Sequence, residues 1–236
     1  MEKLIKRIGV LVFSIIAITL GLSQDVKAGV NVEVDGTTAV VSWDGEGKAE
    51  IVGETSFTSF EVHTILDEVS DEVENVIIDK SIKNIGENAF DSCSNLKSIT
   101  IPNSVKSIGI AAFDQCTGLE SIEIPNSVKS IGHHAFCDCI NLTDITISNS
   151  IKSIESWTFG GCESLTSIKI PNSVKSIGGS AFNCCSNLKS ITIPNSVKFI
   201  EKDAFGFCDE ITIKCKKGSY AHKYAKKNKR KCKIIK

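Results

Sequence analysis

Histidine and cysteine side chains, which bind transition metals, gather in one stretch of the sequence. The segment HHAFCDC places His133, His134, Cys137 and Cys139 close together along the chain. Zinc ligands usually pair at C-x-x-C or H-x-x-x-H spacing, and neither spacing occurs in the sequence. We therefore expect no metal site, and no other residues indicate a cofactor.

Motifs of catalysis are missing as well. The sequence holds no G-x-S-x-G, no H-E-x-x-H and no phosphate-binding glycine loop. Serine is abundant, but most serines recur at one repeated position without a paired histidine and aspartate. We expect no catalytic residues and no enzymatic activity.

Six lysines recur at a constant spacing and form a cationic pattern that suits a repeating anion. They are Lys83, Lys106, Lys129, Lys152, Lys175 and Lys198. If these positions stack about one strand spacing apart, ~4.8 Å, they form a row for sulfated glycans or teichoic acid. The alternative is a solvated stripe that deters aggregation. Few aromatic residues interleave the row, so we expect no nucleic acid partner.

The lysines belong to a repeat that covers most of the chain. The nonapeptide IPNSVKSIG occurs at 101–109, 124–132 and 170–178, with near-copies at 147–155 and 193–201. Successive copies set a period of 23 residues, with full units beginning at Ser81, Ser104, Ser127, Ser150 and Ser173 and a shorter sixth at Ser196. A period of this length predicts a solenoid whose units are stable only when stacked.

Each unit predicts two extended segments and a turn. Ile99 and Ile101 alternate with polar neighbours, as in a strand with one solvated face. Pro102 ends this strand because it cannot donate a ladder hydrogen bond. The segment SVKSI favours a second short extended piece, and AAFDQC at 111–116 predicts a single helical or 3₁₀ turn.

Stacking would bury columns of phenylalanine, leucine and cysteine. The phenylalanines are Phe90, Phe113, Phe136, Phe159, Phe182 and Phe205, and the cysteines are Cys93, Cys116, Cys139, Cys162, Cys185 and Cys208. Neighbouring column cysteines point the same way, whereas a disulfide needs converging Cβ vectors. We expect them to be free buried thiols. Outside the column we expect Cys137 and Cys184 to react with thiol reagents, while Cys215 and Cys232 either bridge or stay free.

The consensus SIxIPNSVKSIGxxAFxxCxxL over residues 73–213 resembles the BspA-like leucine-rich repeats of bacterial surface and secreted proteins. The resemblance implies an α/β repeat: a right-handed leucine-rich-repeat solenoid with a parallel strand ladder, 23-residue rungs and a cap at each end. It also implies binding or adhesion rather than catalysis. The chain departs from the pattern at Ser148, which replaces proline, at Glu155 and Glu201, which replace the turn glycine, and at Trp157–Thr158.

The first 28 residues are typical of a signal peptide. Lys3, Lys6 and Arg7 precede an uncharged apolar run of 15 residues, and Val26 and Ala28 fit the −3 and −1 positions of a cleavage site. The alternative is a membrane anchor, for which the run is shorter than the ~20 residues of a span. We expect a secreted or cell-surface protein with no membrane span in the mature chain.

The segments that flank the repeat predict caps. Residues 29–72 predict a β-hairpin around Asp35–Gly36 and a helix at 58–69, with a small separate domain as the alternative. Residues 214–236 predict a helix with Ser219 as N-cap and a last strand at 231–235.

The two ends carry opposite charge. Residues 29–80 hold 13 acidic residues against two lysines, a net charge of −11, and residues 214–236 hold ten lysines and one arginine with no acid, a net charge of +11. The charges either protect strand edges or allow head-to-tail self-association.

Candidate ligand-binding residues are those where the rungs differ and those of the lysine row. They are Glu123, Asp144 and Lys169 on the strand face, His133 and Trp157 in the turns, and Lys106, Lys129, Lys152 and Lys175. We expect a binding or adhesion module whose partner is an extracellular protein or an anionic glycan. The alternative is a structural or self-associating surface protein that uses its charged ends.

Overall fold

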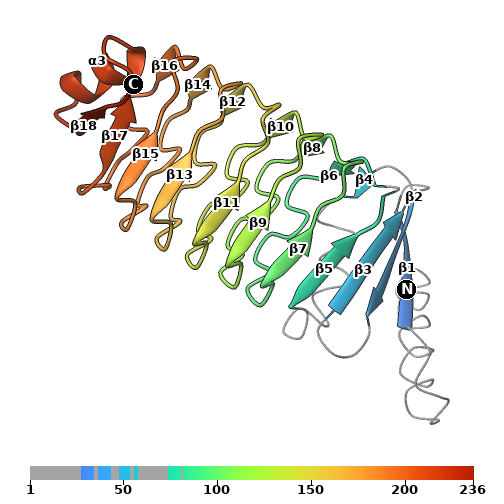
Figure 1. Cartoon of the computed structure of the whole chain (residues 1–236). Coiled ribbons are helices and arrows are strands. Elements are labelled where there is room, and N and C mark those ends of the chain that lie inside the picture. The colour runs from blue at the N-terminus through green and yellow to red at the C-terminus, as the bar shows by residue number, and fades with distance from the viewer. Residues whose placement is uncertain (1–27, 35–36, 44–47, 54–55, 58–73, 81) are drawn as a thin grey trace.

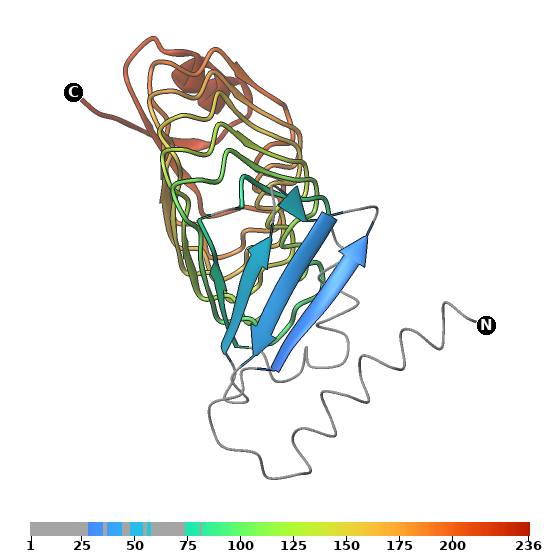
Figure 2. The ribbon, with the colours of Figure 1, turned by 90° about the vertical axis from the view of Figure 1, so that its right-hand side faces the viewer.

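The structure is a computed structural model, and it describes residues 28–34, 37–43, 48–53, 56–57, 74–80 and 82–236. The predicted signal peptide, apart from Ala28, and the predicted helix at 58–69 lie outside these residues. The chain winds into an elongated parallel solenoid with β1 near one end and α3 at the other (Figure 1). Viewed from the N-terminal side, the successive turns overlie one another (Figure 2).

One side of the solenoid is a ladder of longer strands. These are β5 (Asn75–Ile78), β7 (Ser98–Thr100), β9 (Ser121–Glu123), β11 (Asp144–Thr146), β13 (Ser167–Lys169), β15 (Ser190–Thr192) and β17 (Thr212–Cys215). Paired strands are parallel. Partners such as Ile122 and Ile145 stand 23 residues apart, except between β15 and β17, where Ile191 pairs with Ile213, 22 residues on. The period in the sequence is therefore the register of the ladder, which confirms the predicted rung.

A second side carries a ladder of two-residue strands. These are β6 (Asn84–Ile85), β8 (Ser107–Ile108), β10 (Ser130–Ile131), β12 (Ser153–Ile154), β14 (Ser176–Ile177) and β16 (Phe199–Ile200). The glycine that follows several of these strands is needed because neighbouring backbones approach closely. A Cβ at Gly132 would lie 2.5 Å from the nitrogen of Ile110, a contact that real Cβ atoms do not make. This close approach gives one reason why IPNSVKSIG recurs unchanged.

The third side is built from stacked turns. Ala111 and Gln115 adopt left-handed φ values of 50° and 56°. Their N–H groups donate to the next rung, from Ala111 to His133 O at 2.9 Å and from Gln115 to Cys137 O at 2.8 Å. Within the rung, the Asp114 N–H donates to Ala111 O at 3.1 Å and the Cys116 N–H donates to Phe113 O at 3.3 Å. The single turn predicted here is thus present as hydrogen-bonded turns of the i→i+3 kind, without a helix.

The phenylalanine column forms the centre of the core. All six rings are fully buried. Successive ring centroids lie 5.1 to 5.7 Å apart with interplanar angles of 3° to 21°. Tyr224 meets the last ring, Phe205, edge-on at 5.9 Å.

The cysteine column adds a hydrogen bond to each rung. Cys116 Sγ lies 3.0 Å from Phe90 O, and the four later column thiols repeat this contact, each to the phenylalanine 26 residues earlier, at 2.9 to 3.2 Å. Burial raises the pKa of the Cys116 and Cys162 thiols well above the ordinary value. Cysteine therefore serves here as a small apolar residue that also donates to a buried carbonyl.

Strand pairing extends beyond the repeat at both ends. β1 (Ala28–Val34) and β2 (Thr37–Trp43) pair antiparallel, and β2 continues antiparallel to β3 (Lys48–Gly53). β3 pairs parallel with β5, and β4 (Ser56–Phe57) pairs parallel with β6. Both ladders thus continue into the segment that the sequence assigns to an N-terminal cap, and the boundary near residue 73 stays a prediction.

At the other end, α3 (Tyr220–Lys227) lies between β17 and β18 (Lys231–Ile234), which pair parallel. Ser219 caps the helix as predicted, since its Oγ accepts from the His222 N–H at 3.2 Å. The Arg230 guanidinium donates to Phe205 O at 2.8 Å and to Cys208 O at 2.9 Å. The right-handed coil and the assignment of both flanking segments as caps stay predictions.

Candidate functional site

The face of the longer strands presents small polar and charged side chains. Glu123 and Asp144 are exposed on neighbouring strands, where Asp144 pairs with Ser121 and Glu123 with Thr146. Lys169 is exposed on β13. Within the described residues no ion pair joins these three side chains. They stay available to a ligand, in a mixed-charge surface flanked by serine and threonine.

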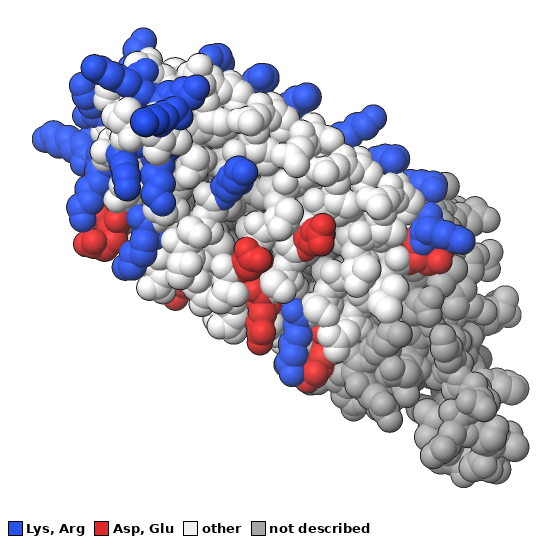
Figure 3. Space-filling view, in the orientation of Figure 1, with Lys and Arg blue, Asp and Glu red and all other residues white. Residues whose placement is uncertain are grey.

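The lysines occupy another side, next to the short strands. All six are exposed. Backbone bonds hold them in register: the Lys106 N–H donates to Lys83 O at 2.7 Å, and the Lys129 N–H donates to Lys106 O at 2.8 Å. Lys175 donates to Lys152 O and Lys198 to Lys175 O at 2.7 and 2.8 Å. These bonds join the lysines in two sets of three, because β10 and β12 belong to separate sheets. Figure 3 shows a row of basic side chains along the edge that carries β6 to β16.

Within the part of the chain that the structure describes, this row has no counter-charge of its own. Among the described carboxylates, none forms an ion pair with a lysine of the row. Lys83 and Lys198 turn their Nζ atoms to the carbonyl oxygens of Lys80 and Asn195. The row is therefore a cationic array on a rigid ladder, with its charge open to an external anion.

The turn side holds the aromatic and histidine residues that distinguish the middle rungs. The His134 and Trp157 rings stack at 5.8 Å with an interplanar angle of 6°. A Cβ at Gly160 would lie 2.5 Å from Trp157 Cε3, so glycine provides the room for the indole. His133 Nε2 lies 3.7 Å from Glu155 Oε2. The Trp157 side chain is thus half-buried and packs against its neighbours, whereas His133 is exposed beside the Glu155 carboxylate.

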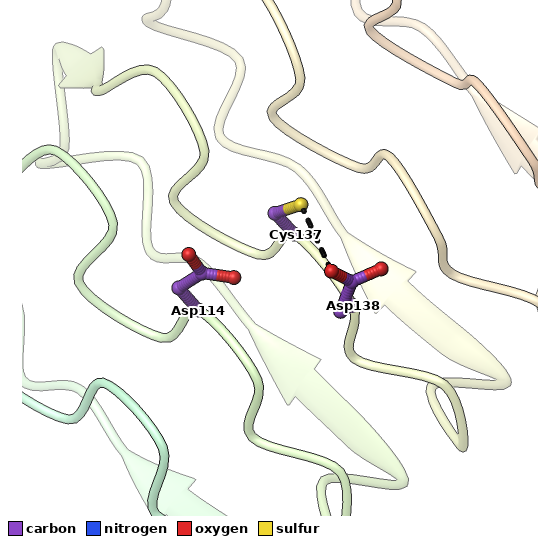
Figure 4. Close-up of side chains that lie close together, drawn as sticks. All are labelled: Asp114, Cys137 and Asp138. Atoms are coloured by element: carbon purple, nitrogen blue, oxygen red, sulfur yellow. Dashed lines mark hydrogen bonds between the residues drawn. The ribbon is translucent and has the colours of Figure 1, made fainter.

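Three potential metal ligands meet on the same side, from neighbouring rungs. Figure 4 shows Asp114, Cys137 and Asp138, whose ligand atoms all lie within 4.8 Å of one another. Cys137 Sγ lies 3.6 Å from Asp138 Oδ2. The sequence did not group these three residues, because Asp114 stands one rung before the other two.

The electrostatics of this cluster keep its thiol protonated. Burial, followed by the charges of Asp138 and Asp114, raises the pKa of Cys137 to about 12. Burial also raises the pKa of Asp114, with Asp91 and Asp138 adding to the effect. A thiolate and two carboxylates would suit a cation such as Zn²⁺, but no further observation points to a bound ion. The prediction that Cys137 reacts with thiol reagents is wrong, because its side chain is buried.

The segment HHAFCDC is divided between different environments. Cys139 donates to Phe113 O in the core, His134 stacks on Trp157, and His133 contacts Glu155. The predicted binding residues lie on three separate sides of the solenoid and form no single site. The sequence missed the cluster of Asp114, Cys137 and Asp138, although the 23-residue offset between Asp114 and Cys137 could have indicated it.

The basic C-terminal segment is a further charged surface. Basic side chains crowd the end of the molecule that carries α3 and β18 (Figure 3). Lys231 Nζ lies 3.3 Å from Glu210 Oε2. The lysine row and this end are therefore two separate candidates for anion binding.

Two parallel ladders around stacked phenylalanine, leucine and isoleucine columns define a leucine-rich-repeat solenoid. The chain belongs to the BspA-type leucine-rich repeat family: a family model described as "BspA type Leucine rich repeat region" matches residues 68–128 and 106–225 with six copies. No curated protein matches the chain. Among the described residues, no helix has the length and apolar character needed to cross a membrane.

Solved structures of bacterial leucine-rich repeat proteins are similar to this chain. The leucine-rich repeat protein of T. pallidum is 26% identical, with a TM-score of 0.60 over 79% of this chain and 91% of that one. A leucine-rich cell surface protein of Faecalibacterium prausnitzii is 17% identical, with a TM-score of 0.43 over 83% and 97% of the two chains. The pneumococcal vaccine antigen PcpA is 16% identical, with a TM-score of 0.32 over 89% and 100%.

Proposed function

We propose that the protein is a secreted or cell-surface binding module whose lysine row holds an anionic glycan or a similar polyanion. The observation that carries this proposal is the row itself: exposed lysines, one per rung, held by backbone hydrogen bonds in two sets of three and without a described carboxylate partner. Membership of the BspA-type leucine-rich repeat family supports an extracellular or surface location.

The strength of such binding depends on how many lysines act together. A single exposed ion pair contributes about 0–1 kcal/mol, so one lysine holds no ligand. A polyanion with charges spaced near the rung separation engages several lysines at once, and the rigid ladder has already fixed their spacing. Salt weakens these contacts, because exposed charges are screened beyond ~8–10 Å at physiological ionic strength.

The test compares two variants that each lose four positive charges. The row variant carries Lys106, Lys129, Lys152 and Lys175 as glutamine, and the end variant carries Lys226, Lys227, Lys229 and Lys231 as glutamine. Arg230 is kept, because it donates to two backbone carbonyls. Retention on immobilised heparin and on teichoic acid is measured at rising salt. We expect the row variant to elute at lower salt than both the wild type and the end variant.

Two results would contradict the proposal. Loss of retention in the end variant alone assigns anion binding to the C-terminal segment. Failure of the wild type to be retained at low salt leaves the row as a solvated stripe.

A protein ligand would use the strand face instead. Glu123, Asp144 and Lys169 break the serine and threonine pattern there and are exposed. Exchanging their charges, with Glu123→Lys, Asp144→Lys and Lys169→Glu together, changes this surface while leaving the row intact. An extracellular-protein array probed with the wild type and this variant tests the assignment: a partner that both bind equally does not use this face.

Self-association is the second candidate function, and the opposite charges of the terminal segments favour it. Residues 29–80 carry a net charge of −11 and residues 214–236 one of +11. Head-to-tail contacts would then join molecules into larger assemblies at low salt, and these assemblies would dissociate at high salt. Light scattering of the wild type and the end variant across salt concentrations checks this, and a mass that is independent of salt and variant excludes it.

A further inference from the structure

The last strand of the solenoid is weakly held. All four residues of β18 are exposed, and among the described strands it pairs only with β17. Its side-chain ties among the described residues are few, with Lys231 paired to Glu210 at the surface. A four-residue edge strand that pairs with one neighbour separates readily. A covalent link in addition to the ladder hydrogen bonds would therefore stabilise its position.

Two cysteines meet where β18 joins the solenoid. Cys232 is in register with Ile213, and Cys215 is in register with Ile234. Ile213 and Cys215 share the buried face of β17, because alternate residues of a strand point the same way. Cys232 therefore lies on the same face as Cys215. Their Sγ atoms are 3.5 Å apart, and both thiols are free.

The other cysteines are placed differently. Cys185 and Cys208 also interact through their side chains, but both thiols are buried in the column and neither is exposed to an external oxidant as Cys232 is. The column thiols point at phenylalanine carbonyls in the core, as Cys185 does toward Phe159 O at 3.0 Å. Cys184 is exposed, but its neighbour Cys185 faces the buried side. Cys137 contacts the carboxylate of Asp138.

We propose that Cys215 and Cys232 form a redox-sensitive disulfide that fastens β18 to the end of the solenoid. The oxidant is an external disulfide, of the class carried by extracytoplasmic thiol oxidants or by oxidised low-molecular-weight thiols. The inference rests on the proposed function only for where the oxidant is met, since exported proteins encounter oxidising conditions.

The exchange proceeds in two balanced steps. The exposed Cys232 loses its proton and attacks the external disulfide, which forms a mixed disulfide and releases one thiolate. Cys215 then loses its proton and attacks Cys232 Sγ, which forms the internal disulfide and releases the second thiolate. Two protein thiols are oxidised, one external disulfide is reduced to two thiols, and the protons pass to the released thiolates.

The structure sets the order of attack. Cys215 is buried, and its pKa is raised to about 11 by burial and by the neighbouring Cys232. Cys232 is exposed and reaches a bulky oxidant first. The buried thiol then acts only on the mixed disulfide that forms beside it.

The bond would close a loop of 17 residues that contains α3. The closed loop would hold the lysines of β18 and of the preceding segment at a fixed place on the end of the molecule. Reduction would release the strand while the phenylalanine and cysteine columns stay intact. Oxidation would thus set how rigidly the basic end is displayed.

The test uses the purified full chain with oxidised glutathione as the probe. In Cys184→Ser, which lacks the other exposed thiol and so takes up no glutathione there, the intact mass should fall by about 2 Da on closure of one disulfide. The reduced wild-type chain holds ten cysteines, and closure of the bond removes two of the free thiols that are counted after denaturation. Trypsin cleaves after the lysines between residues 216 and 231, and the piece containing Cys232 should separate from the protein only after reduction.

Matched variants assign the bond. Cys232→Ser should form no internal disulfide and therefore should show neither the mass loss nor the loss of two thiols. Cys184→Ser, which removes the other exposed cysteine, should form the bond as the wild type does. The midpoint of urea unfolding should rise by about 1 M on oxidation of the wild type and stay unchanged for Cys232→Ser.

Several results would overturn the inference. A stable glutathione adduct on Cys232, about 305 Da heavier and present in Cys184→Ser as well, shows that Cys215 does not resolve the mixed disulfide. A mass loss that persists in Cys232→Ser places the bond elsewhere, and disulfide-linked dimers show that the contact is intermolecular. Exchange on the purified chain does not depend on location or ligand, so its failure and a failure of heparin binding are separate results.

Discussion

Removing one ring from the phenylalanine column tests the stacked core directly. Phe136 is fully buried. Its ring stacks on Phe113 at 5.2 Å with a 3° angle and on Phe159 at 5.7 Å with a 9° angle. Phe136→Ala therefore opens a cavity at the middle of the column and removes both stacked contacts at once.

The expected loss of stability follows from these contacts. Truncating a buried phenylalanine to alanine lowers the free energy of unfolding by about 3–5 kcal/mol in protein cores. Two stacked pairs, each worth about 0.5–1.5 kcal/mol beyond burial, place this site in the upper half of that range. Since domains are stable by only about 5–15 kcal/mol, the variant should lose a large part of its free energy of unfolding.

Urea unfolding followed by circular dichroism measures this loss. With a denaturant slope near 3 kcal/mol per molar, the midpoint should fall by about 1–2 M. Phe207→Ala is the matched control, because Phe207 is 74% exposed in the last rung, and its free energy should change by no more than about 0.5 kcal/mol. If Phe136→Ala and Phe207→Ala unfold alike, the stacked column does not hold the fold together.

Three other predictions follow from the described residues. A thiol reagent without denaturant should label Cys184 and Cys232 in the reduced chain and spare Cys137; rapid labelling of Cys137 would contradict its burial. Gly132→Ala should lower the urea midpoint, because its Cβ would lie 2.5 Å from backbone, whereas Gly179→Ala, whose Cβ would meet only the Asp203 side chain at 3.3 Å, should unfold much as the wild type does. The contribution of the Cys137 thiol to the free energy of unfolding should be fully present below pH 9 and should be lost as the pH rises toward 12. The reason is that the pKa of this thiol is about 12 in the folded chain, whereas its ordinary value, which applies to the unfolded chain, is 9.0. Cys137→Ser should lose less over that interval in urea unfolding at a series of pH values, and an equal loss in both proteins would refute the assignment.

The columns could be predicted from the sequence because the period of a solenoid is also its contact map. Residues 23 positions apart, such as Phe113 and Phe136, must be neighbours once each rung stacks on the next. Alternation around Ile99 and the proline at 102 then fixed which residues face inward. No information from outside one unit was needed for these features.

The turn conformation could not be predicted in the same way. AAFDQC has the spacing of a helical turn, and neither Ala111 nor Gln115 signals a left-handed φ. Their conformation is stabilised by hydrogen bonds to the next rung, which local propensity does not contain. The burial of Cys137 was missed for the same reason, since its thiol lies beside Asp114 of the preceding rung.

The candidate site was only partly accessible from the sequence. The spacing of the lysines gave the row, and the structure adds its register and the lack of described counter-charges. The spacing did not show that Glu123 and Trp157 lie on different sides, because that depends on where each rung bends. The contact between Cys215 and Cys232 depends on the pairing of β17 with β18, which a single-sequence pattern leaves open.

The identity of the nonapeptides at 101–109, 124–132 and 170–178 has a consequence for how the chain folds. A rung that docks against the next rung but one meets the same phenylalanine, cysteine and isoleucine contacts and leaves one unit of 23 residues looped out. This wrong pairing therefore loses little contact energy at first. Irregular contacts break this degeneracy. The ring of Trp157 stacks on His134, and the carboxylate of Asp138 fits beside Gly161, where any Cβ would overlap it. The residues that depart from the consensus therefore favour the correct pairing of rungs over pairings shifted by one unit. The register of the solenoid is set by these irregular positions rather than by the repeated ones.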